Sequence, residues 1–196
     1  VLQHSPVIHE IILAVPEGDL DYCRSDLAVR SGFSKITRVG AGGKERQDSV
    51  RHALEHVPVE TDIVVVHDAV RPFLTLDMVA HVVEAARRVG GAIVALPMRD
   101  TVKQVGSNHH IERTVDRGPL WLAQTPQAFR RDRLLDAHRK AHADDVRATD
   151  DAFLFEWAGH PVVVVEGSGE NIKVTRPEDM VIGEAILASR QPGRMK

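Results

Sequence analysis

The segment Asp62–His67, with the sequence DIVVVH, constrains the fold more than any other part of the chain. An uninterrupted run of β-branched residues, bounded by polar ones, is typical of a short strand. A strand that faces water on one side would alternate apolar and polar residues, whereas a continuous apolar run indicates cover on both faces. The segment therefore predicts a strand of a parallel sheet with helices on both sides.

Short apolar segments of this kind alternate along the chain with longer segments that have helical spacing. The predicted strands are Ile8–Val15, Ser34–Val39, Asp62–His67, Ala92–Leu96, Val162–Val165 and a short one at Ile172–Thr175. The predicted helices are Asp19–Arg30, Glu45–His56, Leu76–Val89, Arg131–Ala143, Asp150–Ala158 and Pro177–Ser189. This alternation predicts an α/β protein with an open, mostly parallel sheet and helices on both faces.

The α/β rhythm is interrupted between Arg99 and Arg117. Two alternating segments, Val102–Val105 and Ile111–Val115, flank the turn-forming residues Gly106–Asn108. This pattern predicts a β-hairpin that projects from the main sheet as an arm, over about residues 99–117.

The arm has two interpretations from the sequence. A polar hairpin is often solvated surface, but it can also reach into the site of a neighbouring subunit. Trp121 and Phe129 follow the arm closely, and aromatic residues are enriched where proteins meet. We therefore expect the arm to join two copies of the chain in a homodimer.

Length and composition fit one domain of ordinary size. The chain has 196 residues, of which 43% are hydrophobic and 27% charged, so it can bury a core of its own. The formal net charge of -3 argues against a general nucleic-acid-binding protein, which would show a basic face. Cys23 is the one cysteine, which excludes an internal disulfide and fits a reducing compartment. Because no apolar run reaches membrane-spanning length, we expect a cytoplasmic protein that binds neither nucleic acid nor a membrane.

A carboxylate and a guanidinium follow the buried strand directly, at Asp68 and Arg71. Ligands of open α/β sheets bind beyond the carboxyl ends of the strands. Asp68 is therefore placed to hold Mg²⁺ against phosphate oxygens, and Arg71 is placed to bind a further phosphate group. The alternative is that Asp68 only caps the next turn and that Arg71 pairs with it.

Three more segments are candidates for ligand contacts, each with a plain structural alternative. The glycine-rich segment from Gly42 to Ser49 precedes a predicted helix, so its backbone amides can approach a ligand, although glycine turns before helices are common. Thr149 lies at a predicted helix N-terminus, where it or Asp150 would cap the helix. Lys173 lies in a short apolar segment and either faces solvent or points at an anion.

Several segments together make the chain similar to the 2-C-methyl-D-erythritol 4-phosphate cytidylyltransferase family of the non-mevalonate isoprenoid pathway. They occur in the family's order across nearly the whole chain, and the set is specific although each segment alone is modest. The matching segments are GGKERQDSV (42–50), VVVHDAVRPF (64–73), LPMRDTVK (96–103), RTVDRGPLW (113–121), AQTPQAF (123–129), ATDDA (148–152) and NIKVTRPED (171–179).

The resemblance implies a Rossmann-like domain with a β-arm that is exchanged across a homodimer. It also implies a Mg²⁺-dependent reaction in which CTP and 2-C-methyl-D-erythritol 4-phosphate give the CDP-alcohol and pyrophosphate. No strong general base is required, because a phosphate monoester is already an anionic nucleophile. The site must overcome the repulsion between two anions, which cations and a metal ion do.

The resemblance also implies roles for particular residues of this sequence. Gly43 and Ser49 would contact the cytosine, and Asp68 would bind Mg²⁺ and lie near the ribose. Arg117 and Lys173 would be the catalytic residues that position the sugar-alcohol phosphate for attack. The remaining residues would hold that phosphate or lie in the same pocket: Arg71 and Thr101 across the dimer, and Thr125 and Thr149 beside the site.

Two features of the family are not found in this sequence. The family begins with a strand and a glycine-rich loop that carries an Arg and then a Lys and wraps the triphosphate, whereas this sequence opens at VLQHS. The family also has a helix between that HS pair and the next strand, whereas here Ser5 runs directly into Pro6. We therefore expect the intact protein to contain a further strand, loop and helix.

Two other functions stay open from the sequence. A cytidylyltransferase for another polyol phosphate, such as ribitol 5-phosphate, would need similar residues, although Arg99–Thr101, Arg117 and NIKVT (171–175) favour methylerythritol phosphate. A non-catalytic nucleotide-binding homologue would fit a chain without the phosphate loop. Testing both polyol phosphates as substrates decides between the first alternative and the methylerythritol phosphate enzyme. Finding the phosphate loop in the complete reading frame would exclude the second alternative.

Overall fold

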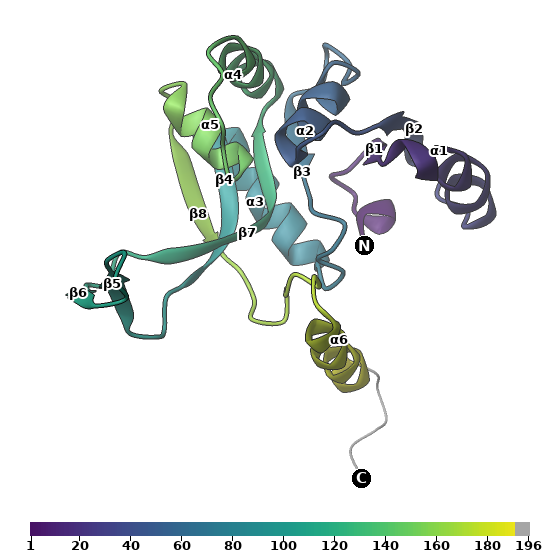
Figure 1. Ribbon diagram of the computed structural model, residues 1–196. Coiled ribbons are helices and arrows are strands. Elements are labelled where there is room, and N and C mark those ends of the chain that lie inside the picture. Colours follow the sequence, from purple (N-terminus) through teal and green to yellow (C-terminus); the bar gives the residue numbers. More distant parts are fainter. Residues whose placement is uncertain (191–196) are drawn as a thin grey trace.

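The computed structural model describes residues 1–190, except for the side chains of residues 27–30. Its strands form a two-stranded sheet, a four-stranded sheet and a separate hairpin (Figure 1). The strands are β1 (Ile11–Val15), β2 (Ile36–Ala41), β3 (Ile63–Val66), β4 (Gly91–Pro97), β5 (Val102–Val105), β6 (Ile111–Val115), β7 (Trp121–Arg130) and β8 (Val162–Glu166). The helical segments are η1 (Leu2–His4), η2 (Glu17–Asp19), α1 (Leu20–Tyr22), η3 (Cys23–Arg30), α2 (Arg46–Leu54), α3 (Leu76–Val89), α4 (Arg131–Ala143), α5 (Asp151–Trp157) and α6 (Pro177–Arg190).

The central sheet has the order β3–β7–β4–β8 and is mixed. β4 and β8 are parallel, whereas β7 is antiparallel to both of its neighbours, β3 and β4. The prediction of a mostly parallel sheet is therefore wrong here, because the sequence analysis assigned no strand to β7. The chain leaves β4, forms the arm and returns without a crossover helix, and a direct return of this kind pairs antiparallel.

Helices cover both faces of the central sheet, as predicted for an α/β protein. The buried side of α3 packs on one face together with Ala92 and Val94 of β4. The buried sides of α4 and α5 pack on the other face together with Ile93 and Ala95. Successive side chains of a strand point to opposite faces, so this alternation divides the apolar core into two layers.

The helix α3 begins and ends where its sequence predicts. Thr75 caps its N-terminus by accepting a hydrogen bond of 3.2 Å from the backbone N–H of Met78. Gly90 ends it with a φ of 115°, which is a conformation that glycine adopts without the strain a side chain brings. The bounds of α4 also match the prediction.

The predicted short strand at Ile172–Thr175 is wrong. The segment belongs to no sheet, and its backbone contact outside the segment is a 2.8 Å hydrogen bond from Val174 N–H to the carbonyl of Val70. A single backbone bond does not make a ladder, so side-chain contacts fix this segment instead.

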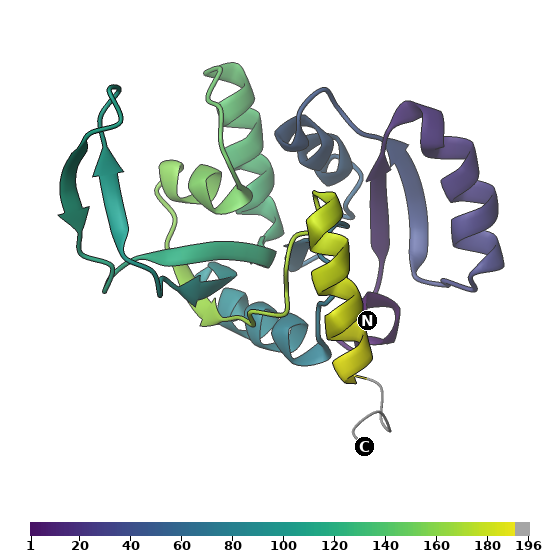
Figure 2. The same ribbon diagram turned by 60° about the horizontal axis from the view of Figure 1, so that its bottom comes forward.

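The parallel pair β1–β2 lies at one side of the molecule and the β5–β6 hairpin at the opposite side, as both views show (Figures 1 and 2). The helix α2 contacts β1, β2 and α4 and so connects the N-terminal strands with the rest of the protein. The hairpin is the predicted arm, with Val102 opposite Val115 and Lys103 opposite Thr114. No helix among residues 1–190 is long and apolar enough to cross a membrane.

Replacing Phe129 with alanine tests the packing of the central sheet. Phe129 of β7 is fully buried, and its ring centroid lies 4.9 Å from that of Phe155 in α5. We expect Phe129→Ala to lower the free energy of unfolding by about 3–5 kcal/mol, because it leaves a cavity beneath α5. The control Phe153→Ala removes the same side chain from a 44% exposed position and should cost about 1 kcal/mol or less. Urea denaturation measures both variants, and equal losses would contradict this packing.

Candidate active site

A polar hollow of about 230 Å³ lies beyond the carboxyl end of β3. Several of the predicted site residues line it, together with residues that the sequence analysis did not name. The lining residues are Arg46, Asp68, Arg71, Ala123, Gln124, Thr125, Gln127, Thr149, Asp150 and Lys173.

The carboxylate of Asp68 lies between two cations in this hollow. Its Oδ1 accepts a 2.8 Å hydrogen bond from Nε of Arg46, and its Oδ2 lies 3.1 Å from Nζ of Lys173. The backbone carbonyl of Asp68 accepts a 2.9 Å bond from the N–H of Arg71. The alternative in which the Arg71 side chain pairs with Asp68 is therefore not observed, although the two residues do share a turn.

These cations decide the charge of Asp68. Burial by itself would raise the pKa of its carboxyl group, since the side chain is only 13% exposed. The hydrogen bond and the charge of Arg46, followed by those of Lys173, outweigh burial and lower the pKa. Asp68 is therefore ionised at neutral pH and available to a metal ion or a polar ligand.

Arg46, at the first position of α2, is the main site residue that the sequence analysis missed. Its Nε donates to Asp68, and its terminal nitrogen Nη1 donates a 2.8 Å bond to Oδ2 of Asp151. Burial acts to lower the pKa of Arg46, but the charge of Asp151 and bonds to both carboxylates raise it, so the guanidinium is charged. Its place within the glycine-rich segment, in the first turn of a predicted helix, was the available signal.

Thr125 connects β7 to the loop that carries Asp68. Its Oγ1 accepts a 3.0 Å bond from the backbone N–H of Asp68 and lies 3.0 Å from Nδ1 of His67. The pairing of β7 with β4 is irregular between Ile93 and Ala95, opposite this part of β7. Irregularities of this kind re-aim side chains next to functional sites. Thr125 is only 4% exposed, and its hydroxyl holds the Asp68 loop in place.

Buried Asn171 anchors the segment that carries Lys173. Its side-chain Nδ2 donates a 2.9 Å bond to the backbone carbonyl of Thr125. Its backbone carbonyl accepts a 2.8 Å bond from Nη1 of Arg71. The side chain of Asn171 is fully buried. These contacts explain how Lys173 points into the hollow from a segment that belongs to no sheet.

Gly43 and Ser49 of the glycine-rich segment lie beside the hollow without lining it. The hydroxyl of Ser49 accepts a 2.9 Å bond from the N–H of Gly43 and donates a 3.1 Å bond to the carbonyl of Glu45. A Cβ atom at Gly43 would lie 2.2 Å from Cβ of Asp48, which real structures do not tolerate. Glycine is therefore required here by the close approach of the loop to α2, whose first residue, Arg46, does reach the hollow.

Thr101 and Arg117 lie in the arm and not in the hollow. A terminal nitrogen of Arg117 donates to the carbonyl of Arg99, which closes the base of the arm. Thr149, in contrast, lines the hollow. Its neighbour Asp150 caps α5 by accepting a 3.0 Å bond from the N–H of Phe153, as one of the sequence alternatives proposed.

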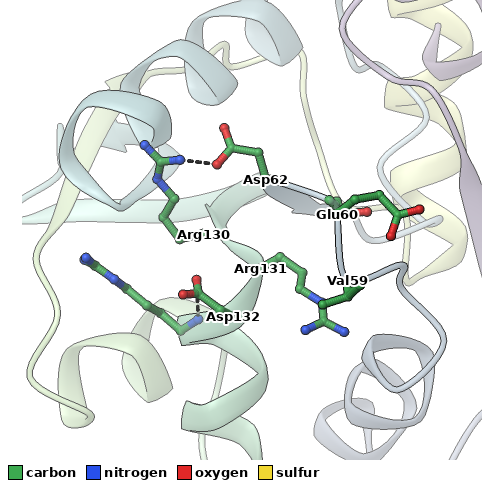
Figure 3. A pocket seen from close by; sticks show the side chains of 8 residues that line it. Val59, Glu60, Asp62, Arg130, Arg131 and Asp132 are labelled. Atoms are coloured by element: carbon green, nitrogen blue, oxygen red, sulfur yellow. Dashed lines mark hydrogen bonds and ion pairs between the residues drawn. The ribbon is translucent and has the colours of Figure 1, made fainter.

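A larger hollow of about 500 Å³ lies at the opposite end of β3, where Asp62 precedes the strand (Figure 3). Arg130, Arg131 and Arg133 line it, and the first two are bound by groups of the protein. Arg130 binds Asp62, and Arg131 donates a 2.9 Å bond to the carbonyl of Val57. The smaller hollow around Asp68, at the ligand-binding end of the sheet, is therefore the better candidate for the active site.

The residues of the smaller hollow fit a magnesium ion that arrives with phosphates. Among the side chains that the structure describes, no group of three or more His, Cys, Asp or Glu could hold a metal by itself. Mg²⁺ in nucleotide sites is commonly held by one or two carboxylates together with substrate phosphates and water. Asp68 supplies such a carboxylate, which cations contact here at both oxygens. Both oxygens of Asp150 accept bonds from an amide side chain and a backbone N–H.

Comparisons with known proteins identify the family of this chain. Residues 1–189 match the family model of IspD, 2-C-methyl-D-erythritol 4-phosphate cytidylyltransferase. The enzyme of that name from Syntrophus aciditrophicus is 48% identical over 194 residues, covering 99% of this chain and 82% of that protein. The one from Pelotomaculum thermopropionicum is 44% identical over 194 residues, covering 99% and 81%.

Solved structures agree in fold. The 4-diphosphocytidyl-2C-methyl-D-erythritol synthase of Anaerococcus prevotii has a TM-score of 0.87 at 30% identity, covering 95% of this chain and 82% of that one. The 2-C-methyl-D-erythritol 4-phosphate cytidylyltransferase of Thermus thermophilus has a TM-score of 0.78 at 36% identity, covering 91% and 82%.

The α/β fold and the charged hollow at its strand ends are those of a nucleotidyltransferase. More particularly, the chain belongs to the 2-C-methyl-D-erythritol 4-phosphate cytidylyltransferase (IspD) family.

Lowering the pH tests the ion pairs around Asp68. Because its pKa is lower in the folded protein, ionised Asp68 stabilises the fold above the ordinary carboxyl pKa of about 4. That contribution is lost as the pH falls through the lowered folded value. We expect the difference in the free energy of unfolding between wild type and Asp68→Asn to be largest above about pH 5 and to shrink towards about pH 2. Urea denaturation across this range measures it.

Asp62→Asn is the matched control for this experiment. Asp62 lies at the other end of β3 and also binds an arginine, but its side chain is 53% exposed. Exposed ion pairs contribute little, so this substitution should change the free energy of unfolding by less than about 1 kcal/mol at every pH. A constant difference between wild type and Asp68→Asn across the whole range would contradict the role given to Arg46 and Lys173.

Proposed function

We propose that this chain transfers CMP from CTP to 2-C-methyl-D-erythritol 4-phosphate and releases pyrophosphate. The observation that carries the proposal is the hollow in which the Asp68 carboxylate lies between Arg46 and Lys173, beside Arg71. Such a site combines one ligand for a hard cation with several charges for phosphate groups. It occurs in a chain that is 48% identical to a protein named for this activity.

The reaction requires a phosphate oxygen of the acceptor to attack the α-phosphorus of CTP. A new P–O bond forms between the α-phosphorus and the acceptor. The bond between the α-phosphorus and the oxygen that bridges to the β-phosphate breaks, and the β- and γ-phosphates leave together as pyrophosphate. Lys173 and Arg71 reduce the repulsion between the two anions and hold the attacking phosphate. Orientation of the nucleophile, and not its deprotonation, is the task of the site.

Mg²⁺ fits the proposal as a cofactor that Asp68 would hold together with the triphosphate. When bound, it supplies positive charge to the phosphate oxygens of the nucleotide. Asp68 must then share its carboxylate between the metal ion and the two cations that bind it here. Arg46 and Lys173 keep Asp68 ionised and oriented for this purpose.

The proposed base-binding part of the site is the loop before α2. Gly43 and Ser49 shape this loop, and its backbone groups would contact the cytosine ring. Thr149 borders the same hollow, and Thr125 acts on it indirectly by holding the loop of Asp68. In this respect the ligand site follows the Rossmann-like rule of binding beyond the carboxyl ends of strands.

We further propose that two chains form a homodimer through the arm. Thr101 and Arg117 do not line the hollow of their own chain, so an arm exchanged with a second copy would bring them to the partner's site. Val105 and Ile111 of the arm are 48% and 62% exposed. A hairpin with exposed apolar residues is poorly stable alone, and pairing with a second arm would bury these side chains.

Steady-state kinetics test the proposed function. The wild-type chain should release pyrophosphate from CTP and Mg²⁺ with methylerythritol phosphate, and release at least about tenfold less with ribitol 5-phosphate. Lys173→Ala should lower kcat/KM for the acceptor by about 100-fold, because a misplaced nucleophile loses the advantage of proximity. The control Lys140→Ala removes an exposed lysine that lies over the ring of Trp157, away from the hollow, and should leave the kinetics unchanged.

Other kinetic results would favour one of the two alternative functions. A preference for ribitol 5-phosphate would make the chain a cytidylyltransferase for another polyol phosphate. Binding of CTP without release of pyrophosphate from either acceptor would favour a non-catalytic nucleotide-binding homologue. Unchanged kinetics in Lys173→Ala would remove this residue from the site.

Light scattering tests the dimer. The wild-type chain should have about twice the mass of one 21.6 kDa chain at micromolar concentration. Ile111→Asp should shift the protein to monomer, because a charge would be desolvated in the pairing of two arms. The control Val59→Asp places the same charge at an 82% exposed position outside the arm and should remain dimeric. A monomeric wild type would overturn this part of the proposal.

A further inference from the structure

We propose that His138 and Asp151, buried behind the hollow, are positioning residues that fix the guanidinium of Arg46 and through it the carboxylate of Asp68. The role assigned to Asp68 rests on the proposed function. The contact chain itself is a structural claim that can be tested without activity.

The four side chains form one continuous line of contacts from the core to the hollow. Nε2 of His138 lies 2.9 Å from Oδ1 of Asp151, whose Oδ2 accepts the 2.8 Å bond from Arg46. Nε of Arg46 then donates the 2.8 Å bond to Asp68. Arg46 and Asp68 line the hollow, whereas His138 and Asp151 do not. The last two therefore act on the site through Arg46.

Burial makes Asp151 dependent on its partners. Its side chain is 1% exposed and that of His138 is fully buried. A carboxylate removed from water is stable only when charged or hydrogen-bonded groups satisfy it. Each oxygen of Asp151 has one such partner, Arg46 on one side and His138 on the other. Because a carboxylate can only accept, Nε2 of His138 carries the proton of their hydrogen bond.

Arg46 requires this support because its own side chain is long and 33% exposed. A flexible guanidinium with one exposed partner gains little from pairing, since ordering it costs conformational entropy. A second bond to a rigid, buried carboxylate fixes its plane and so aims Nε at Asp68. Without this anchor, Lys173 would be the remaining cation on Asp68, and its flexible stem orients a carboxylate less well.

The positions of the residues support a role beyond packing. His138 lies on α4, Asp151 on α5, Arg46 on α2 and Asp68 after β3. The line of contacts thus joins three helices and a strand end at one point of the site. An apolar side chain in place of His138 would fill the same space without orienting Asp151, which allows packing and positioning to be separated by experiment.

Nuclear magnetic resonance of the arginine Nε–H groups provides a readout that does not depend on activity. In the wild-type chain the Nε–H of Arg46, assigned by its loss in Arg46→Lys, should be protected from exchange by its bond to Asp68. We expect His138→Leu to remove this protection and His138→Gln to retain it, since a glutamine amide also donates a hydrogen bond. His142→Leu, an exposed histidine one turn further along α4, is the matched control and should leave the signal unchanged.

Kinetics then connect the contact chain with the site. His138→Leu should lower kcat/KM for CTP by about 10-fold to 100-fold and raise the Mg²⁺ concentration required for half-maximal rate, because Asp68 is misplaced. His138→Gln should remain within about twofold of wild type. If His138→Leu does not fold, Asp151→Leu takes its place, since a leucine side chain accepts from neither partner, and it should show the same losses.

The proposal is overturned if the Nε–H protection of Arg46 and the kinetics are both unchanged in a folded His138→Leu or Asp151→Leu variant. A loss of thermal stability alone, with both readouts unchanged, also overturns it, because His138 would then only pack. If the wild-type chain transfers no CMP, the proposed function fails, whereas the resonance of Arg46 still decides whether the contact chain exists.

Discussion

The guanidinium of Arg46 lies between two carboxylates, and the arrangement of the site depends on it. One carboxylate, Asp68, lies 22 positions further along the chain, and the other, Asp151, lies 105 positions further. A planar donor with several N–H groups can bind both at once, which a lysine ammonium at the end of a flexible stem does less well. The same cation balances the charge of a buried acid and keeps the partly buried Asp68 ionised. Core and site are thereby joined by one residue.

The central sheet brings this cation and its partners together. β7 returns antiparallel between β3 and β4, and its irregular pairing places Thr125 against the loop of Asp68. The backbone carbonyl of Thr125 also accepts a hydrogen bond from the side chain of Asn171, and this bond positions the segment that carries Lys173. The strand that the sequence analysis did not assign therefore holds both sides of the hollow. The two faces of the sheet are covered by α3 and by α4 and α5, so an apolar core lies on each side of it.

Two of the candidate site residues lie in the arm, away from the hollow. Thr101 and Arg117 belong to matched segments of the family, yet they lie on a hairpin that both views show apart from the body of the protein (Figures 1 and 2). In one chain neither residue lines the hollow. A site divided between two chains would couple assembly to catalysis, because neither copy would have all its cations alone.

The sequence by itself determined the elements that depend on local periodicity and the chemistry of single segments. The bounds of α3 and α4, the hairpin of the arm, a cap at Thr149 or Asp150 and the candidates Asp68, Arg71 and Lys173 all follow from spacing, capping or matched motifs. Only the tertiary structure decided the direction of β7 and the partners of Asp68, because both depend on contacts between distant positions. His138 illustrates the limit: along the sequence it is a histidine on a helix, and its relation to the site exists only after α4, α5 and α2 have packed together. Periodicity predicts which side of a helix is buried, but it does not predict which charged side chain of another element will contact that side.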